Sequence, residues 1–344
     1  MHHPVGVALI GCGRIAQVAH LPALEKADGI ELIAVSDPSE DLARGVARRY
    51  DVATVYTDQA QVWADDNVEA VIVAAPDRFH YPITKEALRA GKHVLVEKPM
   101  TSTVAEAEDL VDLVGQTGLV LQVGAMKRHD QGIQFAREFI AGQLGEVRSF
   151  NAWYRIGDLR PGIEATLFPY VYSNPVVRQT ESTFKADRQL YLLATHGAHT
   201  FDTIRYLVGD VASVVARHRH DGRDQMWQMI VTTITGAIGT ASITVDVPGV
   251  PTEGIEVYGA TGSVRVDTPF PFYKKASDVH AYAGGQTVVP THTDGDAYER
   301  QAEAFAAAVR ADANPTPDVH DGLAAVRLID ATAAAVERGE EVKL

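Results

Sequence analysis

The chain has 344 residues, 46% of them hydrophobic and 22% charged, with a formal net charge of −14. This length allows two domains with separate cores, and the composition is ordinary for a soluble globular protein. The negative charge, without any basic stripe, argues against nucleic-acid binding, and no apolar run reaches the roughly 20 residues of a membrane span.

The first predicted strand, residues 5–10, leads into Gly11-Cys12-Gly13-Arg14-Ile15-Ala16, the G-x-G-x-x-A form of a dinucleotide fingerprint. Gly11 would permit the tight turn, Gly13 would let the backbone approach a pyrophosphate, and Ala16 would keep the next helix close to its strand. The N-terminus of that helix would then hold the anion. The alternative is an ordinary strand–turn–helix.

A second predicted strand, residues 31–36, is followed by Asp37, roughly 20 residues beyond the fingerprint, where a carboxylate binds ribose. Pro38 follows, and no Arg or Lys adjoins Asp37, which favours NAD over NADP. Arg14 or Arg44 could still meet a 2′-phosphate.

Cys12 is the only cysteine, so no intrachain disulfide can form, and no signal region precedes the first strand. We therefore expect a reducing, cytoplasmic location. Because Cys12 lies inside the predicted phosphate loop, we interpret it as a small residue that fits there rather than as a reactive thiol.

Strands and helices alternate as far as residue 123, which predicts a doubly wound parallel sheet. The further predicted strands are 69–75, 93–96 and 119–123, and the predicted helices lie near 14–27, 39–50, 58–65, 80–90 and 103–116.

Beyond a helix near 130–142, strands follow one another with few helices between them, which indicates an open antiparallel sheet. The predicted strands are 147–156, 211–219, 226–235, 238–247, 254–259 and 263–267, and the predicted helices are 195–208, 296–312 and 321–338. Residues 157–192 are too irregular for either element. We interpret this segment as a lid or an intersubunit arm rather than a solvated linker.

Glu97-Lys98-Pro99 follows directly on the strand at 93–96. Ligands of open parallel sheets bind at the carboxyl ends of the strands, so we expect Lys98 beside a bound nicotinamide. There it could hydrogen-bond a substrate oxygen and stabilise the developing negative charge. The alternative is a surface lysine paired with Glu97.

Thr195, His199 and Asp202 share one face of a predicted helix, with His196 beside them. A histidine here suits a general base at neutral pH. Asp202 could orient it, although a structural role is simpler. A buried histidine without chemistry, or a zinc ion held by His196, His199 and Asp202, are alternatives. We expect no metal, because Lys98 and His199 suffice for hydride transfer to nicotinamide.

These motifs together resemble the Gfo/Idh/MocA oxidoreductases over nearly the whole chain. Residues 123–130 resemble that family's domain crossover, and 142–147 and 257–263 resemble its later markers. The resemblance implies a Rossmann domain over 1–123. It also implies a C-terminal α/β domain over 124–344, built on a large, mostly antiparallel open sheet, whose terminal helices could pack back on the first domain.

The resemblance further implies a nicotinamide cofactor, sugar or cyclitol substrates, and homodimers or homotetramers joined through the sheet. Lys98 would be the catalytic lysine and His199 the catalytic histidine. Many members carry Asp four residues before that histidine, where this chain has Thr195. A hydroxyl can bind a substrate oxygen but cannot act as a carboxylate, and His196 could compensate.

Two sets of site residues follow. The candidate cofactor-binding residues are Gly11, Cys12, Gly13, Arg14, Ile15, Asp37, Ala74, Pro76, Asp77, His80, Glu97 and Lys98. Polyols need paired donors and acceptors, and the candidate substrate-binding residues are Lys98, Arg128, Asp130, Tyr154, Arg155, Asp158, Thr195, His196 and His199.

The leading hypothesis is an NAD-dependent dehydrogenase that oxidises a secondary ring hydroxyl of a sugar, glycoside or inositol. An alternative is a glycoside hydrolase or a sugar–sugar oxidoreductase that retains NAD and oxidises C3 transiently. A non-catalytic sugar sensor is disfavoured because Lys98 and His199 are both present.

Overall fold

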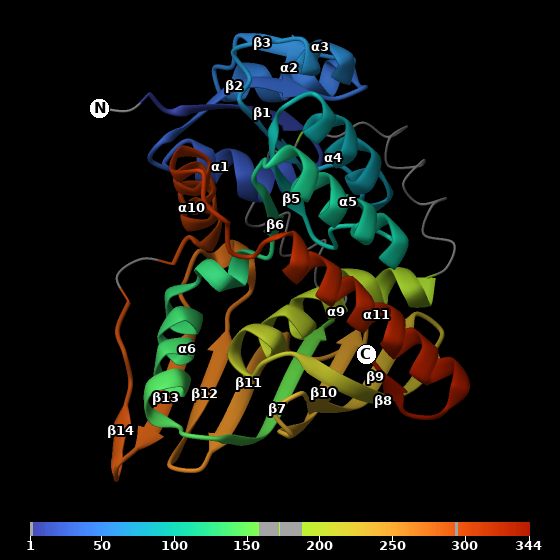
Figure 1. Cartoon of the computed structure of the whole chain (residues 1–344), viewed down its shortest axis with the longest axis vertical. Helices are drawn as coiled ribbons and strands as arrows, with labels where there is room; N and C mark the ends of the chain where they lie inside the picture. Colours follow the sequence, from blue (N-terminus) through green and yellow to red (C-terminus); the bar gives the residue numbers. More distant parts are fainter. Residues whose placement is uncertain (1–2, 158–171, 173–187, 293–294) are drawn as a thin grey trace. The chain divides into compact units, whose positions relative to one another are not determined.

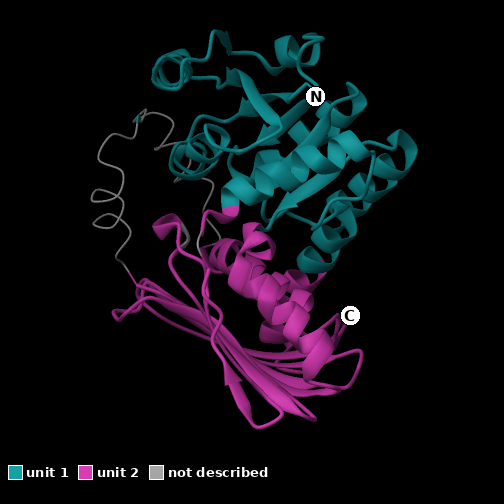
Figure 2. Cartoon of the chain, turned by 90° about the vertical axis from the view of Figure 1, so that its left-hand side faces the viewer, with its two compact units in different colours: residues 1–125, 168–187, 298–326 teal, residues 126–167, 188–297, 327–344 magenta. Residues whose placement is uncertain are grey.

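The computed structural model describes residues 3–157, 172, 188–292 and 295–344 (Figure 1). The chain forms two compact units (Figure 2). Unit 1 takes the described residues of 1–125, Tyr172 and Tyr298–Val326, and unit 2 takes the remainder. The first segment of unit 1 therefore ends two residues beyond the expected division at 123/124, and unit 1 also includes part of the C-terminal helices.

Unit 1 contains a six-stranded parallel sheet in the order β3-β2-β1-β4-β5-β6 among the described residues. Its strands are β1 (Val5–Ile10), β2 (Ile30–Ser36), β3 (Thr54–Tyr56), β4 (Ala70–Val73), β5 (His93–Glu97) and β6 (Leu121–Gly124). This is the order of the dinucleotide-binding fold and confirms the predicted parallel sheet. The short strand β3 was not predicted, because its three residues are half-buried and form no apolar run.

Helices cover both faces of this sheet. One face carries α1 (Leu21–Leu24), α2 (Glu40–Arg49) and α10 (Ala297–Ala311). The other carries α3 (Gln59–Trp63), α4 (His80–Arg89), α5 (Val104–Thr117) and the start of α11 (Val319–Arg338). Phe305 of α10 is fully buried on the first face, which is why this helix belongs to unit 1.

The helix after the fingerprint is not a regular α-helix. A π-helical turn, Ala16–His20, precedes the short α1. Pro22 has no N–H to donate to the carbonyl of Val18, so the regular ladder cannot run through this point. The wider turn buries Gln17 and His20 beside the phosphate loop.

The described residues of unit 2 contain a nine-stranded sheet in the order β14-β13-β12-β11-β7-β10-β9-β8-β15. Its strands are β7 (Val147–Ile156), β8 (Val211–Asp221), β9 (Asp224–Thr233), β10 (Ile238–Val245), β11 (Thr252–Gly259), β12 (Gly262–Thr268), β13 (Asp278–Ala283), β14 (Gln286–Val288) and β15 (Val342–Lys343). Among these, β7 and β10 pair in parallel and the other pairs are antiparallel, which confirms the mostly antiparallel sheet.

Helices cover one face of this second sheet (Figure 1). α6 (Gln131–Gln143) packs on β12 and β13, α9 (Arg188–Leu207) packs on β7 and β10, and later residues of α11 join the same core. Because α9 begins at Arg188, residues 188–192 are helical and do not belong to an irregular connection. Most of the expected lid or arm, 158–171 and 173–187, lies outside the described residues.

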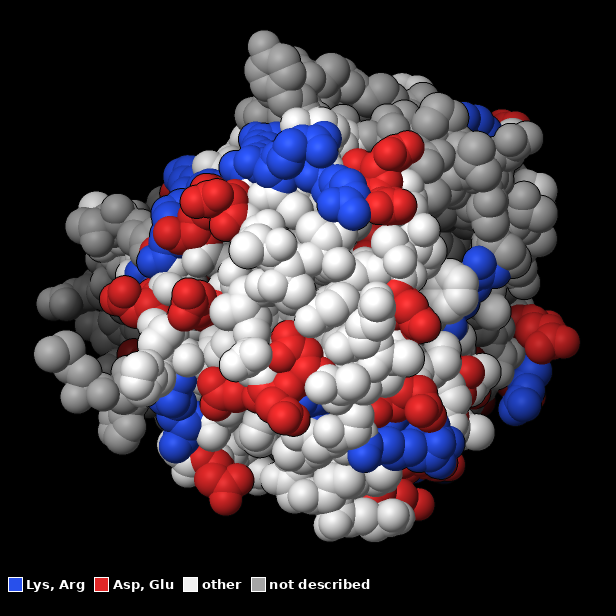
Figure 3. All heavy atoms as spheres, turned by 90° about the horizontal axis from the view of Figure 1, so that it is seen from above, with Lys and Arg blue, Asp and Glu red and all other residues white. Residues whose placement is uncertain are grey.

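The surface of the described residues fits the acidic composition. On the face shown in Figure 3, red acidic side chains are spread among blue basic ones, and the largest blue group lies at the upper edge. No helix in the described part of the chain combines the length and apolarity needed to cross a membrane.

Candidate active site

The phosphate loop follows β1 and needs glycine at Gly11. This residue has φ of +92°, and a Cβ there would fall 2.8 Å from the carbonyl oxygen of Ala74. A Cβ on Gly13 would meet nothing within 4 Å, so the backbone is open at this point. Exposed Arg14 and half-buried Ile15 follow in the same turn.

Asp37 is tied to this loop by hydrogen bonds. Its Oδ2 accepts from the Cys12 N–H at 2.9 Å and its Oδ1 accepts from the Ser39 N–H at 2.8 Å. Burial raises the pKa of Asp37, although the two N–H groups partly offset that effect. Burial, together with the charge of Asp37, also raises the pKa of the Cys12 thiol, so the structure gives Cys12 the properties of an inert small residue.

These features fit a bound dinucleotide. The open backbone at Gly13 leaves room for a pyrophosphate at the start of the helix. Each oxygen of Asp37 accepts one backbone hydrogen bond and retains capacity for a ribose hydroxyl. Gly11, Cys12, Gly13, Arg14, Ile15 and Asp37 thus lie together around one loop.

The second part of the predicted cofactor site in unit 1 lies at the end of β5. Glu97 is buried and accepts from the N–H of Lys98 at 3.1 Å, and its Oε1 lies 2.9 Å from Nε2 of His20. Burial alone would raise the pKa of Glu97. The hydrogen bond and charge of His20, with the charges of Lys98 and His80, outweigh burial and lower that pKa. Half-buried Lys98 therefore follows a firmly held carboxylate.

His80 contacts the loops that follow β4 and β5. Its Nδ1 lies 2.7 Å from the carbonyl of Pro99 and its Nε2 lies 2.9 Å from that of Ala75. The two ring nitrogens therefore connect the turn after β4 with the turn after β5. Ala74 backs the turn at Gly11, whereas exposed Pro76 and half-buried Asp77 lie at the short helix Asp77–Phe79. The dinucleotide fingerprint did not identify His20 and Gln17 as residues of this site. Their sequence spacing gives no indication of the groups to which they hydrogen-bond.

In unit 2, the predicted histidines of α9 meet Tyr154 of β7. The Tyr154 hydroxyl lies 3.2 Å from Nδ1 of buried His196. The ring of half-buried His199 stacks on Tyr154, with centroids 5.9 Å apart and planes at 5°. Thr195 is half-buried one turn before His199. The structure therefore brings three of the predicted substrate-binding residues, Tyr154, His196 and His199, into one cluster.

Lys127 joins this cluster and was not predicted. Its ammonium nitrogen lies 5.4 Å from the centre of the Tyr154 ring and forms an ion pair with Glu253 of β11. Tyr154 and Glu253 face each other in the β7–β11 register, which explains the contact. The sequence signal was weak, because Lys127 adjoins Arg128 and its partner lies 126 residues away.

Arg128, a further predicted substrate-binding residue, forms an ion pair inside unit 2. Its Nε and one terminal nitrogen donate to the carboxylate of Asp202 at 2.7–3.0 Å, and both residues are buried. The ring of Tyr206 lies 5.0 Å from the guanidinium carbon. Asp202 thus neutralises a buried cation and has the structural role considered simpler from the sequence. In the described part of the chain no three His, Cys, Asp or Glu side chains could hold a metal.

Asp130 and Arg155 are two further predicted substrate-binding residues. Asp130 is the N-cap of α6, accepting from the Ile133 N–H at 2.9 Å, and also accepts from the N–H of Ser277. Arg155 is exposed, and strand alternation directs it to the sheet face opposite Tyr154. No substrate is present to test either assignment, and both stay predictions. Asp158 lies outside the described residues.

The six-stranded sheet and the loop around Asp37 define a dinucleotide-binding protein of the Rossmann class. Residues 5–125 match the model of the oxidoreductase family with an NAD-binding Rossmann fold, and residues 189–344 match that of the family's C-terminal alpha/beta domain. The chain therefore belongs to the Gfo/Idh/MocA oxidoreductases, as its motifs predicted, and NAD is its cofactor.

Similar proteins include reductases and dehydrogenases of sugars and polyols. The chain is 31% identical to the dTDP-3,4-didehydro-2,6-dideoxy-alpha-D-glucose 3-reductase of Actinomadura kijaniata, over 96% of this chain and 95% of that protein. It is 29% identical to the inositol 2-dehydrogenase of Rubrobacter xylanophilus, over 99% and 93%. The solved structure of levoglucosan dehydrogenase with NADH has a TM-score of 0.82, at 19% identity over 99% of both chains, and shares the fold.

Proposed function

We propose that this oxidoreductase is an NAD-dependent dehydrogenase acting on a secondary ring hydroxyl of a sugar, glycoside or inositol. Two observations support the proposal, one in each unit. Lys98 follows the buried Glu97 in the cofactor unit, and His199 stacks on Tyr154 in the other unit. The named activities of the relatives, on inositol and on a deoxysugar, support this substrate class.

Lys98 and His199 have different tasks in the proposed reaction. The Lys98 ammonium group donates a hydrogen bond to the substrate oxygen and stabilises the negative charge developing there. His199 accepts the hydroxyl proton. Bound NAD supplies the two-electron acceptor for the hydride.

This chain has Thr195 at the position where many Gfo/Idh/MocA members carry Asp. We propose that Thr195 and His196 together replace that carboxylate. The Thr195 hydroxyl can bind a second substrate oxygen but cannot take a proton at neutral pH. His196 is held by Tyr154 at 3.2 Å and offers a second imidazole on the same helix. We infer that His196 shares the proton that His199 accepts.

The test is NADH formation with a panel of inositols, hexoses and glucosides. We expect Lys98→Met and His199→Asn each to lower kcat by about 10²- to 10⁴-fold, with NAD binding retained. The matched controls Lys343→Met and His220→Asn change exposed residues of unit 2 and should behave as the wild type.

Two outcomes would count against the proposal. Silence across the panel with NAD binding retained would oppose simple dehydrogenation. Release of aglycone from aryl glycosides without net NADH would favour a hydrolase that retains NAD.

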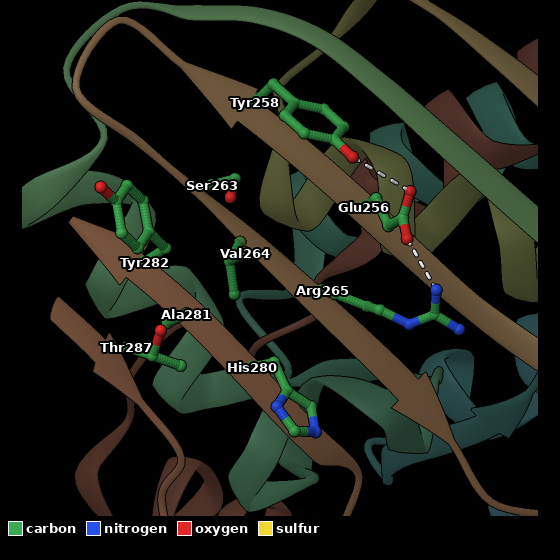
Figure 4. Close-up of a pocket in the computed structure, with 9 residues that line it drawn as sticks. All are labelled: Glu256, Tyr258, Ser263, Val264, Arg265, His280, Ala281, Tyr282 and Thr287. Atoms are coloured by element: carbon green, nitrogen blue, oxygen red, sulfur yellow. Dashed lines mark hydrogen bonds and ion pairs between the residues drawn. The ribbon is translucent and has the colours of Figure 1, made fainter. Parts of the chain in front are cut away.

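We also propose that the open face of the nine-stranded sheet joins copies of the chain as a homodimer or homotetramer. Large side chains point outward from this face, among them Ile230 (51% exposed), Ile238 (55%) and Tyr258 (45%). A hollow of about 250 Å³ is lined by residues of β11 to β14. Figure 4 shows Ser263 between Tyr258 and Tyr282 among these residues. Buried apolar area of this kind drives association.

A further inference from the structure

Gln17 lies in the π-helical turn behind the phosphate loop, and its side chain is almost wholly enclosed, with 3% exposed. Its Nε2 donates to the carbonyls of Cys12 at 2.8 Å and Tyr172 at 2.9 Å. Its Oε1 accepts from the N–H of Tyr172 at 2.8 Å. Gln17 therefore holds both backbone groups of a residue 155 positions further along the chain.

The ring of Tyr172 lies on α2 at Gly45. A Cβ at Gly45 would fall 3.0, 3.2 and 3.3 Å from three ring atoms. Glycine is a poor helix former, so its presence in the middle of α2 needs another reason. The missing side chain makes room for the ring.

Tyr172 is thereby connected to the residues that fit the cofactor. The carbonyl of Cys12 accepts from Gln17, and the N–H of Cys12 donates to Asp37 at 2.9 Å. A continuous line of hydrogen bonds runs from Tyr172 through Gln17 and Cys12 to Asp37, all within unit 1. Releasing Tyr172 would leave the buried amide of Gln17 without two of its partners, which is unfavourable.

We propose that Gln17, Gly45 and Tyr172 form a docking contact, the Tyr172 contact, that stabilises the phosphate loop around bound NAD and slows its release. The loop cannot shift at Cys12 without disturbing Gln17, so departure of NAD and opening of the contact are coupled. This inference goes beyond the proposed reaction, because it concerns retention of the cofactor whatever the substrate.

The first test is the dissociation rate of NADH, followed by its fluorescence during displacement with excess NAD. Gly45→Leu fills the space of the ring and should speed release about tenfold, the size expected when a buried hydrogen-bonded contact is lost. Gly115→Leu is the matched control, since Gly115 is an exposed glycine of α5 with open space around it. It should leave the rate unchanged.

The same substitutions in a Tyr172→Ala background make the test specific. There the ring is absent, so Gly45→Leu should no longer speed release. An equal effect in both backgrounds, or no effect of Gly45→Leu on the wild type, would overturn the proposal.

A second measurement needs no cofactor. The Tyr172 amide should be protected from hydrogen exchange in the NAD-free protein and should lose that protection in Gln17→Met. Exposed Gln116→Met is the control. Unchanged protection in Gln17→Met would contradict the contact. Both measurements omit substrate, so a failed oxidation assay would leave them interpretable, and their failure would leave the proposed oxidation standing.

Discussion

Glu97 and Lys98 are adjacent in the chain but differ in burial. Glu97 is buried and bonded to His20 and to the Lys98 N–H, whereas Lys98 is half-buried. The carboxylate therefore fixes the backbone from which the lysine projects. His20 acts through Glu97 and is a positioning residue in the proposed reaction.

Glu97 should also contribute to stability in a pH-dependent way. Its folded-state pKa lies below the ordinary value of 4.5, so its contribution is fully present above that pH and is lost as pH falls through the lowered pKa. At pH 7, Glu97→Gln should lower the free energy of unfolding by about 2 kcal/mol, and the difference should shrink on acidification. Urea denaturation at pH 7 and pH 4 measures this. The exposed Glu86→Gln is the control, and a constant difference across pH would refute the role.

Local sequence predicted Glu97, Lys98 and Asp37, because each follows a recognisable strand and the ends of parallel strands share one edge. It could not predict His20 as the partner of Glu97, 77 residues away. Nor could it separate Lys127 from Arg128: the first joins the histidine cluster and the second is neutralised in the interior. Such pairings depend on tertiary contacts that spacing does not encode.

Side chains of β7 point alternately to the two faces of the sheet, so Tyr154 and Arg155 lie on opposite faces. Tyr154 faces α9 and contacts both histidines, whereas Arg155 points to the other side of the sheet. Tyr154→Leu should lower kcat/KM about tenfold or more, since His199 and His196 both lose a contact. Arg155→Ala should leave it unchanged. Steady-state kinetics with the best substrate of the panel measure both, and the reverse ranking would contradict this orientation.

Asp130 connects the start of α6 to the segment before β13. It caps the helix through Ile133 and accepts from Ser277, so its removal leaves buried N–H groups without partners. Asp130→Ala should lower the free energy of unfolding by about 2 kcal/mol, the upper end for a helix cap, with KM unchanged. Thermal or urea denaturation gives the first value. Asp58→Ala, which removes the exposed cap of α3, should cost less. A raised KM with full stability would support the substrate role.

Elements with strong periodicity were predictable and weak ones were not. The long strands β7 to β12 alternate buried and exposed residues, and they were identified from sequence. β13 was missed because only Val279 and Ala281 form its buried face. β14 and β15 have three and two residues and were also missed. Their sheet positions come from pairing with β13 and β8, not from intrinsic preference.

The sequence predicted the two sheets but not which helices of the C-terminal region belong to each unit. Alternation of strands and helices indicated a parallel sheet followed by an antiparallel one. The return of α10 to the first sheet depends on Ala302, Phe305 and Ala306, which belong to the same buried cluster as residues of β1 and α2. The sequence of an Ala-rich helix does not indicate which of two sheets the helix will pack against.

Association through the open face of the nine-stranded sheet is the remaining prediction. Ile230 and Ile238 lie on adjacent strands and both point outward. Burying each isoleucine would contribute about 1.5–3 kcal/mol, and a carboxylate there would lose that gain and be desolvated. The double variant Ile230→Glu, Ile238→Glu should therefore shift the particle mass from a multiple of 37.2 kDa to 37.2 kDa at micromolar concentration, measured by light scattering after size exclusion. Val250→Glu is the control, because Val250 is 81% exposed but lies between β10 and β11, outside the strands. A monomeric wild type would contradict association itself. An unchanged mass in the double variant would show that the interface does not include this face of the sheet.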